Sequence, residues 1–334
     1  MHVRILGCGL YGAHLAKALI ADGHGVEVHE IADRIFAGAT GNIPARLHAG
    51  QHYPRSKLTR DACRQHYSEF MTAYGEFTHG IPVNIYAVAE YESLIDFGTY
   101  RQILKDEIEL ITLDRPEELG LQNVEGAILT GERHVLADRL AAYFERELDG
   151  VVQFGKEPGT VDDPRWDLTI DCTSCANDGL NVDRYEACLT LLLKGPTDRA
   201  VTIMDGPFPS LYPWDEERGL SSLTSAKWTP MARCDTWADA HERLYGRGSI
   251  GLIAEHSAQI FNQMAHYYPP VREEYHVVDH RLSIRAMPRS AADARLVDVV
   301  RIGERAIRVR AGKLDAIFHA EKVIREMLPE FGHV

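Results

Sequence analysis

Hydrophobic and polar positions predict alternating strands and helices at the start of the chain. Residues 3–6 are apolar except for Arg4 and predict a strand, and alternate valines predict a second strand over residues 26–30. Between them, apolar side chains at helical spacing predict a helix over residues 10–22. The chain therefore opens with the strand, helix and strand from which parallel sheets are built.

Helical spacing returns in several later segments. A helix is predicted over residues 58–74, and Ser56 is placed to cap its first turn. Further helices are predicted near residues 100–105, 137–148, 236–245, 250–267 and 313–328.

Short strands occupy much of the remaining chain. They are predicted near residues 83–89, 167–172, 187–193, 200–204, 220–226, 275–286, 296–302 and 306–309. The glycine and proline turns between them favour an antiparallel platform over a ligand pocket. We predict an α/β first domain of residues 1–79, 126–182 and 283–334, with an antiparallel α+β domain of residues 80–125 and 183–282 inserted into it.

A glycine-rich turn joins the first strand to the first helix. Gly7 permits the tight turn, Gly9 has no Cβ and lets the backbone approach a pyrophosphate, and Gly12 lets the helix pack on the strand. The second strand ends at Glu30, which can accept hydrogen bonds from ribose hydroxyls. The spacing predicts a dinucleotide site, against the alternative of a strand-helix turn that binds nothing.

The start of the first helix adds to this interpretation. Its free N–H groups, around Leu10 and Tyr11, would face the phosphates at the positive end of the helix dipole. No charged side chain is needed there. This turn alone does not distinguish a nicotinamide from a flavin cofactor.

Composition limits the functional classes. The 334 residues include 45% hydrophobic side chains and carry a net charge of -13, which disfavours a protein that binds nucleic acid or membrane over its whole surface. No apolar run approaches the roughly 20 residues needed to span a bilayer. The first strand begins near residue 3, leaving no room for a cleavable signal peptide, so we expect a cytoplasmic location. Oligomeric state is left open.

The six cysteines include one pair, Cys172 and Cys175, at a spacing known from redox and metal sites. A zinc site would need a second pair or matching histidines, and neither is evident, so no metal is expected. A redox pair stays an alternative. The interpretation we favour is a buried strand over residues 167–172 with Thr173 and Ser174 in its exit turn.

Three further segments carry a family resemblance. With the glycine turn, the small-residue loop at 39–42, the segment 52–55 and the terminal turn at 312–314, the chain resembles the D-amino-acid oxidase superfamily of FAD-dependent oxidoreductases. That superfamily includes glycine, sarcosine and 2-hydroxyglutarate oxidases. The resemblance implies FAD, bound by a Rossmann-like domain of the glutathione-reductase type, and a strand-rich substrate domain.

The resemblance also implies roles for individual residues along the cofactor. Thr40 and Asn42 would bind the pyrophosphate and ribityl chain, His48 would lie beside the isoalloxazine, and Val152 would lie against the adenine. Gly312, Lys313 and Leu314 would start the last helix and direct backbone N–H groups at the flavin's pyrimidine oxygens. The chain departs from the family pattern in the turn at 173–176.

The substrate residues are less certain from sequence. The family's carboxylate-binding arginine motif is altered here, so Arg285 or Arg289 would take that part, or would form surface ion pairs instead. His48 and His52 are the histidines placed near the flavin, as bases, as structural residues or as points of covalent attachment. Aromatic residues Tyr212, Trp214, Trp228, Tyr267 and Tyr268 are candidates for a pocket rim or for core packing.

These features favour oxidation of a C–N bond next to a carboxylate in a small amine or amino acid, with hydride transfer to FAD. Oxidation of a 2-hydroxy acid is the second hypothesis. The third is a modification enzyme acting on an amino-acid-decorated macromolecule such as nucleic acid. It is suggested by a local basic segment, which is unexpected in a chain whose net charge is negative. Its arginines are Arg281, Arg285, Arg289, Arg295, Arg301, Arg305, Arg308 and Arg310.

Overall fold

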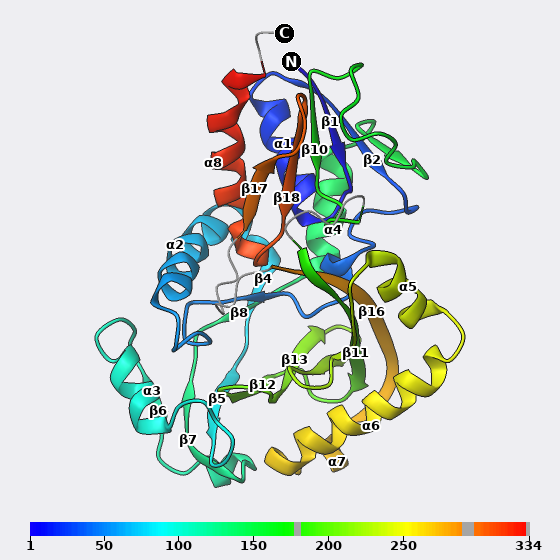
Figure 1. Ribbon diagram of the computed structural model, residues 1–334. Coiled ribbons are helices and arrows are strands. Elements are labelled where there is room, and N and C mark those ends of the chain that lie inside the picture. Colours follow the sequence, from blue (N-terminus) through cyan, green and yellow to red (C-terminus); the bar gives the residue numbers. More distant parts are fainter. Residues whose placement is uncertain (177–181, 289–296, 332–334) are drawn as a thin grey trace.

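The computed structural model of the protein describes residues 1–176, 182–288 and 297–331. Within these ranges the chain forms two large sheets, one above the other in Figure 1, with helices packed around each. The mixture of parallel and antiparallel strands with helices confirms the predicted α/β class. The predicted domain boundaries at residues 126 and 283 fall inside strands, so the division they propose is not reproduced residue by residue.

The first sheet contains the opening strand. Its strands are β1 (His2–Leu6), β2 (Gly25–Glu30), β9 (Val152–Phe154), β10 (Leu168–Asp171), β17 (Asp298–Arg301) and β18 (Ala306–Arg310). In the order β17-β18-β10-β1-β2-β9, all neighbours are parallel except β17 and β18. Strand β10 is buried at every position, and its two polar residues have buried partners: Thr169 accepts a hydrogen bond from Arg4, and Asp171 pairs with Arg308.

Helices cover this sheet and agree closely with the sequence. They are α1 (Leu10–Ala21), α2 (Lys57–Tyr74), α4 (Ala137–Glu147) and α8 (Ile317–Met327). The Ser56 hydroxyl accepts a hydrogen bond from the Thr59 N–H at 3.3 Å, so the predicted cap is confirmed. On α1, the two ring nitrogens of His14 lie 2.7 Å from the Tyr74 hydroxyl and the Glu321 carboxylate, which joins α1, α2 and α8.

The second sheet is larger and mixed. Its strands are β5 (Val83–Ala89), β6 (Ile111–Leu113), β7 (Val124–Leu129), β11 (Val182–Lys194), β12 (Arg199–Met204), β13 (Pro209–Asp215), β14 (Leu220–Ser225), β15 (Pro230–Cys234) and β16 (His276–Pro288). Most neighbours are antiparallel, as predicted, but β12 runs parallel to β5. Strands β7 and β16 carry the predicted boundaries and belong to this sheet along their paired length.

Smaller elements connect the two sheets. Helices α3 (Phe97–Leu104), α5 (Trp237–Tyr245), α6 (Ser249–Tyr267) and α7 (Val271–Glu274) surround the second sheet, and β3 (Arg46–Leu47), β4 (Thr78–Gly80) and β8 (Arg133–Val135) form a short sheet of their own. The predicted helix at 313–328 was wrong at its start. Residues Leu314–Ala316 form a 3₁₀ turn, and α8 begins only at Ile317.

The described arginines of the basic segment do not gather into one surface. Arg285 pairs with Glu186 in the second sheet, whereas Arg308 pairs with Asp171 inside the first. Further ion pairs are Arg281 with Asp279, Arg301 with Glu330 and Arg310 with Asp298. Arg289 and Arg295 lie outside the described residues. These pairings favour ion-pair roles over a single anion-binding face.

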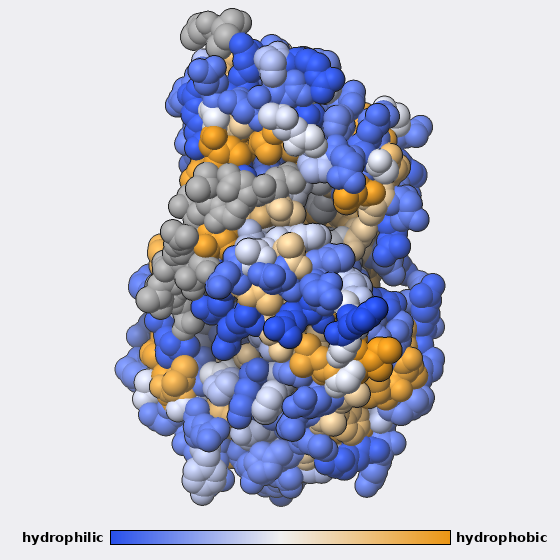
Figure 2. Space-filling model, turned by 45° about the vertical axis from the view of Figure 1, so that its right-hand side comes forward, coloured by the Kyte–Doolittle hydropathy of each residue, from blue (hydrophilic) through white to orange (hydrophobic). Residues whose placement is uncertain are grey.

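On the face drawn in Figure 2, hydrophobic residues form separate patches among hydrophilic ones. Across the described ranges, every helix is too short or too polar to cross a membrane.

The buried pair of Arg308 and Asp171 yields a stability prediction. Both side chains are at most 1% exposed, and Arg308 Nε lies 3.2 Å from Asp171 Oδ2. Replacing Arg308 with alanine leaves a buried carboxylate without its charge partner, so urea denaturation should show a loss of about 3–5 kcal/mol in unfolding free energy. In the matched Arg301→Ala variant the exposed pair with Glu330 is lost, at a cost of at most about 1 kcal/mol. Equal losses in the two variants would contradict this account.

Candidate cofactor and substrate site

A cavity of about 810 Å³ lies at the carboxyl ends of β1 and β10. Its walls come from the turn after β1, the end of β2, the loop 36–45, the turn after β10, helix α5, strand β16 and residues 311–314. In open α/β sheets, ligands bind in the crevice at this edge of the strands. The cavity is therefore the candidate functional site.

The glycine turn forms one wall, and each glycine meets a different steric requirement. Gly7 has a φ of +87°, which favours glycine. A Cβ at Gly12 would lie 2.0 Å from the Gly7 carbonyl oxygen, so this position admits no side chain. A Cβ at Gly9 would make only an ordinary contact of 3.4 Å with Thr40 Oγ1. Because Gly9 lines the cavity, its missing Cβ leaves space for a ligand.

Glu30 is fixed where β2 ends. Its carboxylate accepts hydrogen bonds from the N–H groups of Cys8 at 2.6 Å and Ala32 at 2.9 Å. The side chain is buried and lines the cavity. A carboxylate has about four lone-pair sites, so two of them are left for ribose hydroxyls.

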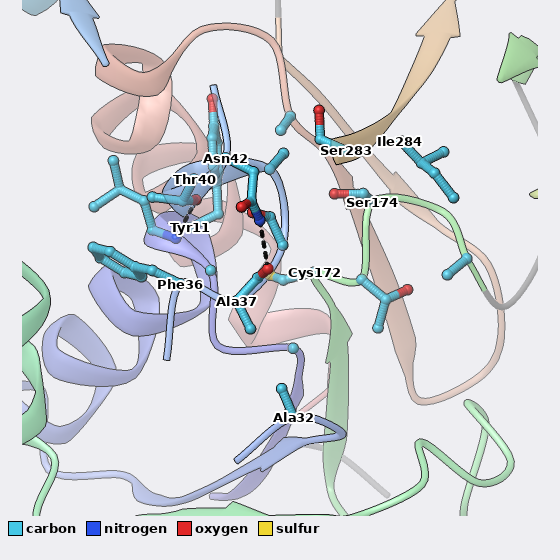
Figure 3. A pocket seen from close by; sticks show the side chains of 18 of the residues that line it. Tyr11, Ala32, Phe36, Ala37, Thr40, Asn42, Cys172, Ser174, Ser283 and Ile284 are labelled. Carbon is cyan, nitrogen blue, oxygen red and sulfur yellow. Dashed lines mark hydrogen bonds between the residues drawn. The ribbon is translucent and has the colours of Figure 1, made fainter. Parts of the chain in front are cut away.

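The loop 36–45 is held by its own side chains, as Figure 3 shows. The N–H of Leu10 donates to Thr40 Oγ1 at 3.2 Å, and Asn42 Nδ2 donates to the carbonyl oxygens of Ala37 and Gly38, both at 2.7 Å. Thr40 and Asn42 are thus placed along the cavity by the glycine turn and by the loop itself. Their hydrogen bonds hold this wall in place before any ligand binds.

The opposite wall contains Ser174, Ser283 and Ile284 (Figure 3). The turn after β10 follows the buried strand as predicted, and no disulfide joins Cys172 to Cys175. Burial raises the pKa of Cys172 well above its ordinary value. A thiol that is hard to ionise is poorly suited to redox exchange, which favours the structural interpretation of this pair.

The glycine turn after β1 and residues 312–314 meet at the cavity. The Tyr11 hydroxyl donates a hydrogen bond to the Lys313 carbonyl oxygen, and Gly312, Lys313 and Leu314 line the cavity. The Lys313 ammonium lies 3.5 Å from the centroid of the Tyr53 ring. Burial alone lowers the pKa of Lys313, but Tyr53 and neighbouring anionic groups outweigh it and leave the pKa raised. A positive charge is therefore retained at this end.

Next to Lys313 and Tyr53 lies a buried polar cluster organised by Glu132. This carboxylate is 1% exposed and accepts hydrogen bonds from the Tyr86 hydroxyl and from the Ala49 N–H at 2.9 Å. His48 Nδ1 lies 2.8 Å from Glu132 Oε2, the oxygen that also accepts from Tyr86. Burial raises the pKa of Glu132. The sequence did not point to Glu132, which lies in an ordinary turn between β7 and β8.

His52 is packed inside this cluster. Its ring stacks on His48 with centroids 5.0 Å apart and meets the rings of Tyr53 and Tyr86 at their edges. Burial lowers the pKa of His52 well below its ordinary value, so the imidazole is neutral. Among the described residues nothing hydrogen-bonds to its buried Nδ1. His52 is thus an unsatisfied polar group within the protein.

Arg46 borders the same cluster, and it too was not among the site residues predicted from the sequence. Its guanidinium lies over the Tyr212 ring at 4.3 Å and donates to Thr202 Oγ1 at 3.2 Å. Its charge contributes to the lowered pKa of His52. No carboxylate in the described part of the chain pairs with it.

Other predicted residues are placed elsewhere. Val152 packs against the core of the first sheet and does not line the cavity. Arg285 also lies outside the cavity lining, paired with Glu186 at 2.8 Å, and Arg289 is outside the described residues. Tyr267 and Tyr268 are core residues of the second sheet, as is Tyr212 beneath Arg46, so none forms a rim. The described ranges contain no His, Cys, Asp and Glu cluster able to hold a metal.

Comparison with known proteins identifies the family. The chain is 33% identical over 337 residues to the FAD-dependent monooxygenase FPY4 of Fusarium mangiferae, covering 98% of this chain and 90% of that protein. The chain belongs to this family of FAD-dependent oxidoreductases. It is also 27% identical to the FAD-dependent monooxygenase kojA of Aspergillus flavus, covering 88% of this chain and 78% of that protein. No protein-family model matches the chain.

Solved structures show the same fold at low identity. Glycine oxidase from Geobacillus kaustophilus superposes with a TM-score of 0.71 at 14% identity and covers 99% of this chain and 95% of its own. Fructosamine oxidase from Aspergillus fumigatus gives a TM-score of 0.68 at 14% identity, covering 98% of this chain and 86% of its own. The FAD cofactor predicted from the sequence is confirmed, and these structures have the fold that the resemblance implied.

The residues present fit FAD. Gly9 leaves the space that a side chain would fill, Glu30 presents a fixed carboxylate to a ribose, and the N–H groups at the start of α1 face the same cavity. We propose that Thr40 and Asn42 lie along the pyrophosphate and ribityl chain. Lys313, with the turn at 312–314, would then face the flavin, where its positive charge stabilises electron density gained on reduction.

Gly9 allows cofactor binding to be separated from folding. In Gly9→Ala the new Cβ meets only the Thr40 hydroxyl, so the apoprotein should lose no more than about 1 kcal/mol of unfolding free energy. Titration with FAD should show a dissociation constant raised by about tenfold or more, since the methyl occupies the approach to the pyrophosphate. Gly12→Ala is the packing control, because it should cost about 1–3 kcal/mol of stability without FAD. Unchanged FAD affinity in Gly9→Ala would show that the pyrophosphate does not pass Gly9.

Proposed function

We propose that this FAD-dependent oxidoreductase oxidises a C–N bond in a small amine that carries a carboxylate. The observation that supports this most is the Arg46 guanidinium, which pairs with no carboxylate among the described residues, together with the neutral His52, whose Nδ1 has no hydrogen-bond partner among them. Arg46 offers a cation for a carboxylate, and His52 offers a base for an ammonium proton. The His52 ring adjoins Tyr53, which contacts Lys313 at the wall of the cavity.

Arg46 would anchor the substrate. Stacking on Tyr212 and the hydrogen bond to Thr202 orient the planar guanidinium, so less conformational freedom is lost when it binds a carboxylate. A guanidinium can grip a carboxylate with two parallel hydrogen bonds, which fixes the orientation of the neighbouring carbon. Arg46 thus takes the part that the sequence suggested for Arg285 or Arg289.

His52 would accept the proton from nitrogen. An ammonium has no free electron pair, so it must lose a proton before the C–N bond can be oxidised. Burial disfavours the ammonium just as it disfavours an imidazolium, so a desolvated site promotes that loss, and the neutral imidazole would take the proton. FAD, when bound, would supply the hydride acceptor, and oxygen or another acceptor would take up the two electrons; the substrate would leave as an imine, which water hydrolyses. Glu132 holds His48, and His48 stacks on His52, so these residues position the base.

Monooxygenation is the second candidate. Curated relatives at 33% and 27% identity are named FAD-dependent monooxygenases. Such a reaction inserts one oxygen atom into the substrate and needs an outside reductant, usually a reduced nicotinamide cofactor, to supply two electrons. The hydroxy-acid alternative also stays open, because His52 would accept a hydroxyl proton in the same way.

Flavin reduction without oxygen separates these reactions. Under the leading proposal, an amino acid or carboxylated amine alone bleaches the flavin, and ammonia or an amine is released on hydrolysis. Bleaching by hydroxy acids alone would instead support oxidation of a 2-hydroxy acid. If only NADH or NADPH bleaches the flavin, and ¹⁸O from O₂ then enters the product, monooxygenation is established instead.

The role of Arg46 is tested with a pair of substrates. Arg46→Met keeps an unbranched side chain of similar length but removes the charged hydrogen bonds, which contribute about 1.5–3 kcal/mol. The dissociation constant of the best carboxylated amine, from the substrate dependence of anaerobic flavin reduction, should rise roughly 10- to 150-fold. The matching amine without a carboxylate should bind wild type and variant equally. Parallel weakening of both compounds would contradict a carboxylate anchor.

A further inference from the structure

Helix α5 presents a stripe of three aromatic rings that the proposed chemistry does not use. Trp237 and His241 are stacked, with centroids 5.1 Å apart and planes inclined by 24°, and the His241 and Tyr245 rings are 4.8 Å apart. Residues four positions apart share one face of a helix, so the rings form a continuous edge. We call Trp237, His241 and Tyr245 the α5 aromatic stripe.

The stripe faces the cofactor cavity from the side of the second sheet. All three residues line that cavity, whereas Ala240 on another face of α5 is fully buried in the core of the second sheet. The Tyr245 side chain is 58% exposed although it is large and aromatic. Thr236 caps the helix by accepting a hydrogen bond from the Asp239 N–H at 3.0 Å. A capped helix packed on a sheet therefore holds rings open to the cavity.

The position of α5 selects one part of the cofactor. In Figure 1, α5 lies on the side of the molecule where β2 ends, away from the start of α8. Glu30, at the end of β2, is the carboxylate suited to a ribose, whereas residues 312–314 face the flavin end. Helix α5 is thus on the side of β2 and Glu30, where an adenosine would bind, and away from the side of α8.

We propose that the α5 aromatic stripe binds the adenosine half of FAD by stacking or edge contact with the adenine. A purine offers an apolar face that an exposed aromatic ring can cover, and such contacts tolerate small shifts in register. The Tyr245 ring, open in the protein alone, is the member with most surface left to cover. Because α5 packs on the second sheet, it would close the cofactor cavity from the side of that sheet.

ADP tests this contact directly, because it carries the adenosine half without a flavin. Apoprotein is titrated calorimetrically with ADP, and then with FAD by the loss of flavin fluorescence. Replacing Tyr245 with leucine should weaken both ligands by about tenfold or more, and Tyr245→Phe, which keeps the ring, should restore the affinity for both. The matched control is Tyr91→Leu, since Tyr91 is 69% exposed and does not line the cavity.

The outcomes separate this contact from folding and from the proposed reaction. Apoprotein melting temperatures should be alike for wild type and both Tyr245 variants, because the ring is exposed. Equal ADP affinity in wild type and Tyr245→Leu would overturn the proposal, whatever happens to the substrate KM. Failure of carboxylated amines to bleach the flavin would reject the proposed C–N oxidation and leave the ADP result unaffected.

Discussion

The close approach of Gly12 to the Gly7 carbonyl is the contact on which the site depends. It brings the start of α1 against the end of β1 more tightly than any side chain would allow, since a Cβ there would lie 2.0 Å from that oxygen. The hydrogen bonds around the cavity start from this turn: Cys8 binds Glu30, Leu10 binds Thr40, and Tyr11 binds the Lys313 carbonyl. Backbone geometry thus positions side chains from distant parts of the chain.

Burial determines the electrostatics beyond this turn. A polar group taken from water costs free energy unless it is paired, and His52 has no partner for Nδ1 among the described residues. Glu132 is compensated by hydrogen bonds but still has a raised pKa because it is buried. Buried residues with an unpaired polar atom or a shifted pKa are characteristic of binding sites, where a ligand supplies the missing hydrogen bond or charge. The same argument applies to Arg46, whose neighbours are a hydroxyl and a ring but no carboxylate in the described structure.

The sequence predicted the structural features that depend only on residues close together in the chain. The glycine turn, the Ser56 cap and the buried strand β10 are local, so spacing and residue type were sufficient. Arg46 and Glu132 are 86 positions apart and reach the same region because β3 pairs with β8, which sets Arg46 opposite His134. No periodicity encodes that pairing. Arg285 is a similar case, because only the register of β16 against β11 sets it opposite Glu186. The start of the last helix failed differently, because residues 314–316 favour helix but adopt the tighter 3₁₀ turn.

One cavity with walls from both sheets has a mechanical consequence. The glycine turn and Glu30 belong to the first sheet, whereas α5 and β16 belong to the second. Any ligand that contacts both walls stabilises their packing by an amount set by its affinity for the folded state. The short sheet of β3, β4 and β8 lies between them and carries Arg46. Tyr212 and Thr202 already orient Arg46 without a ligand, so a cofactor that fixes the two large sheets would reinforce the position of this strand and would not create it.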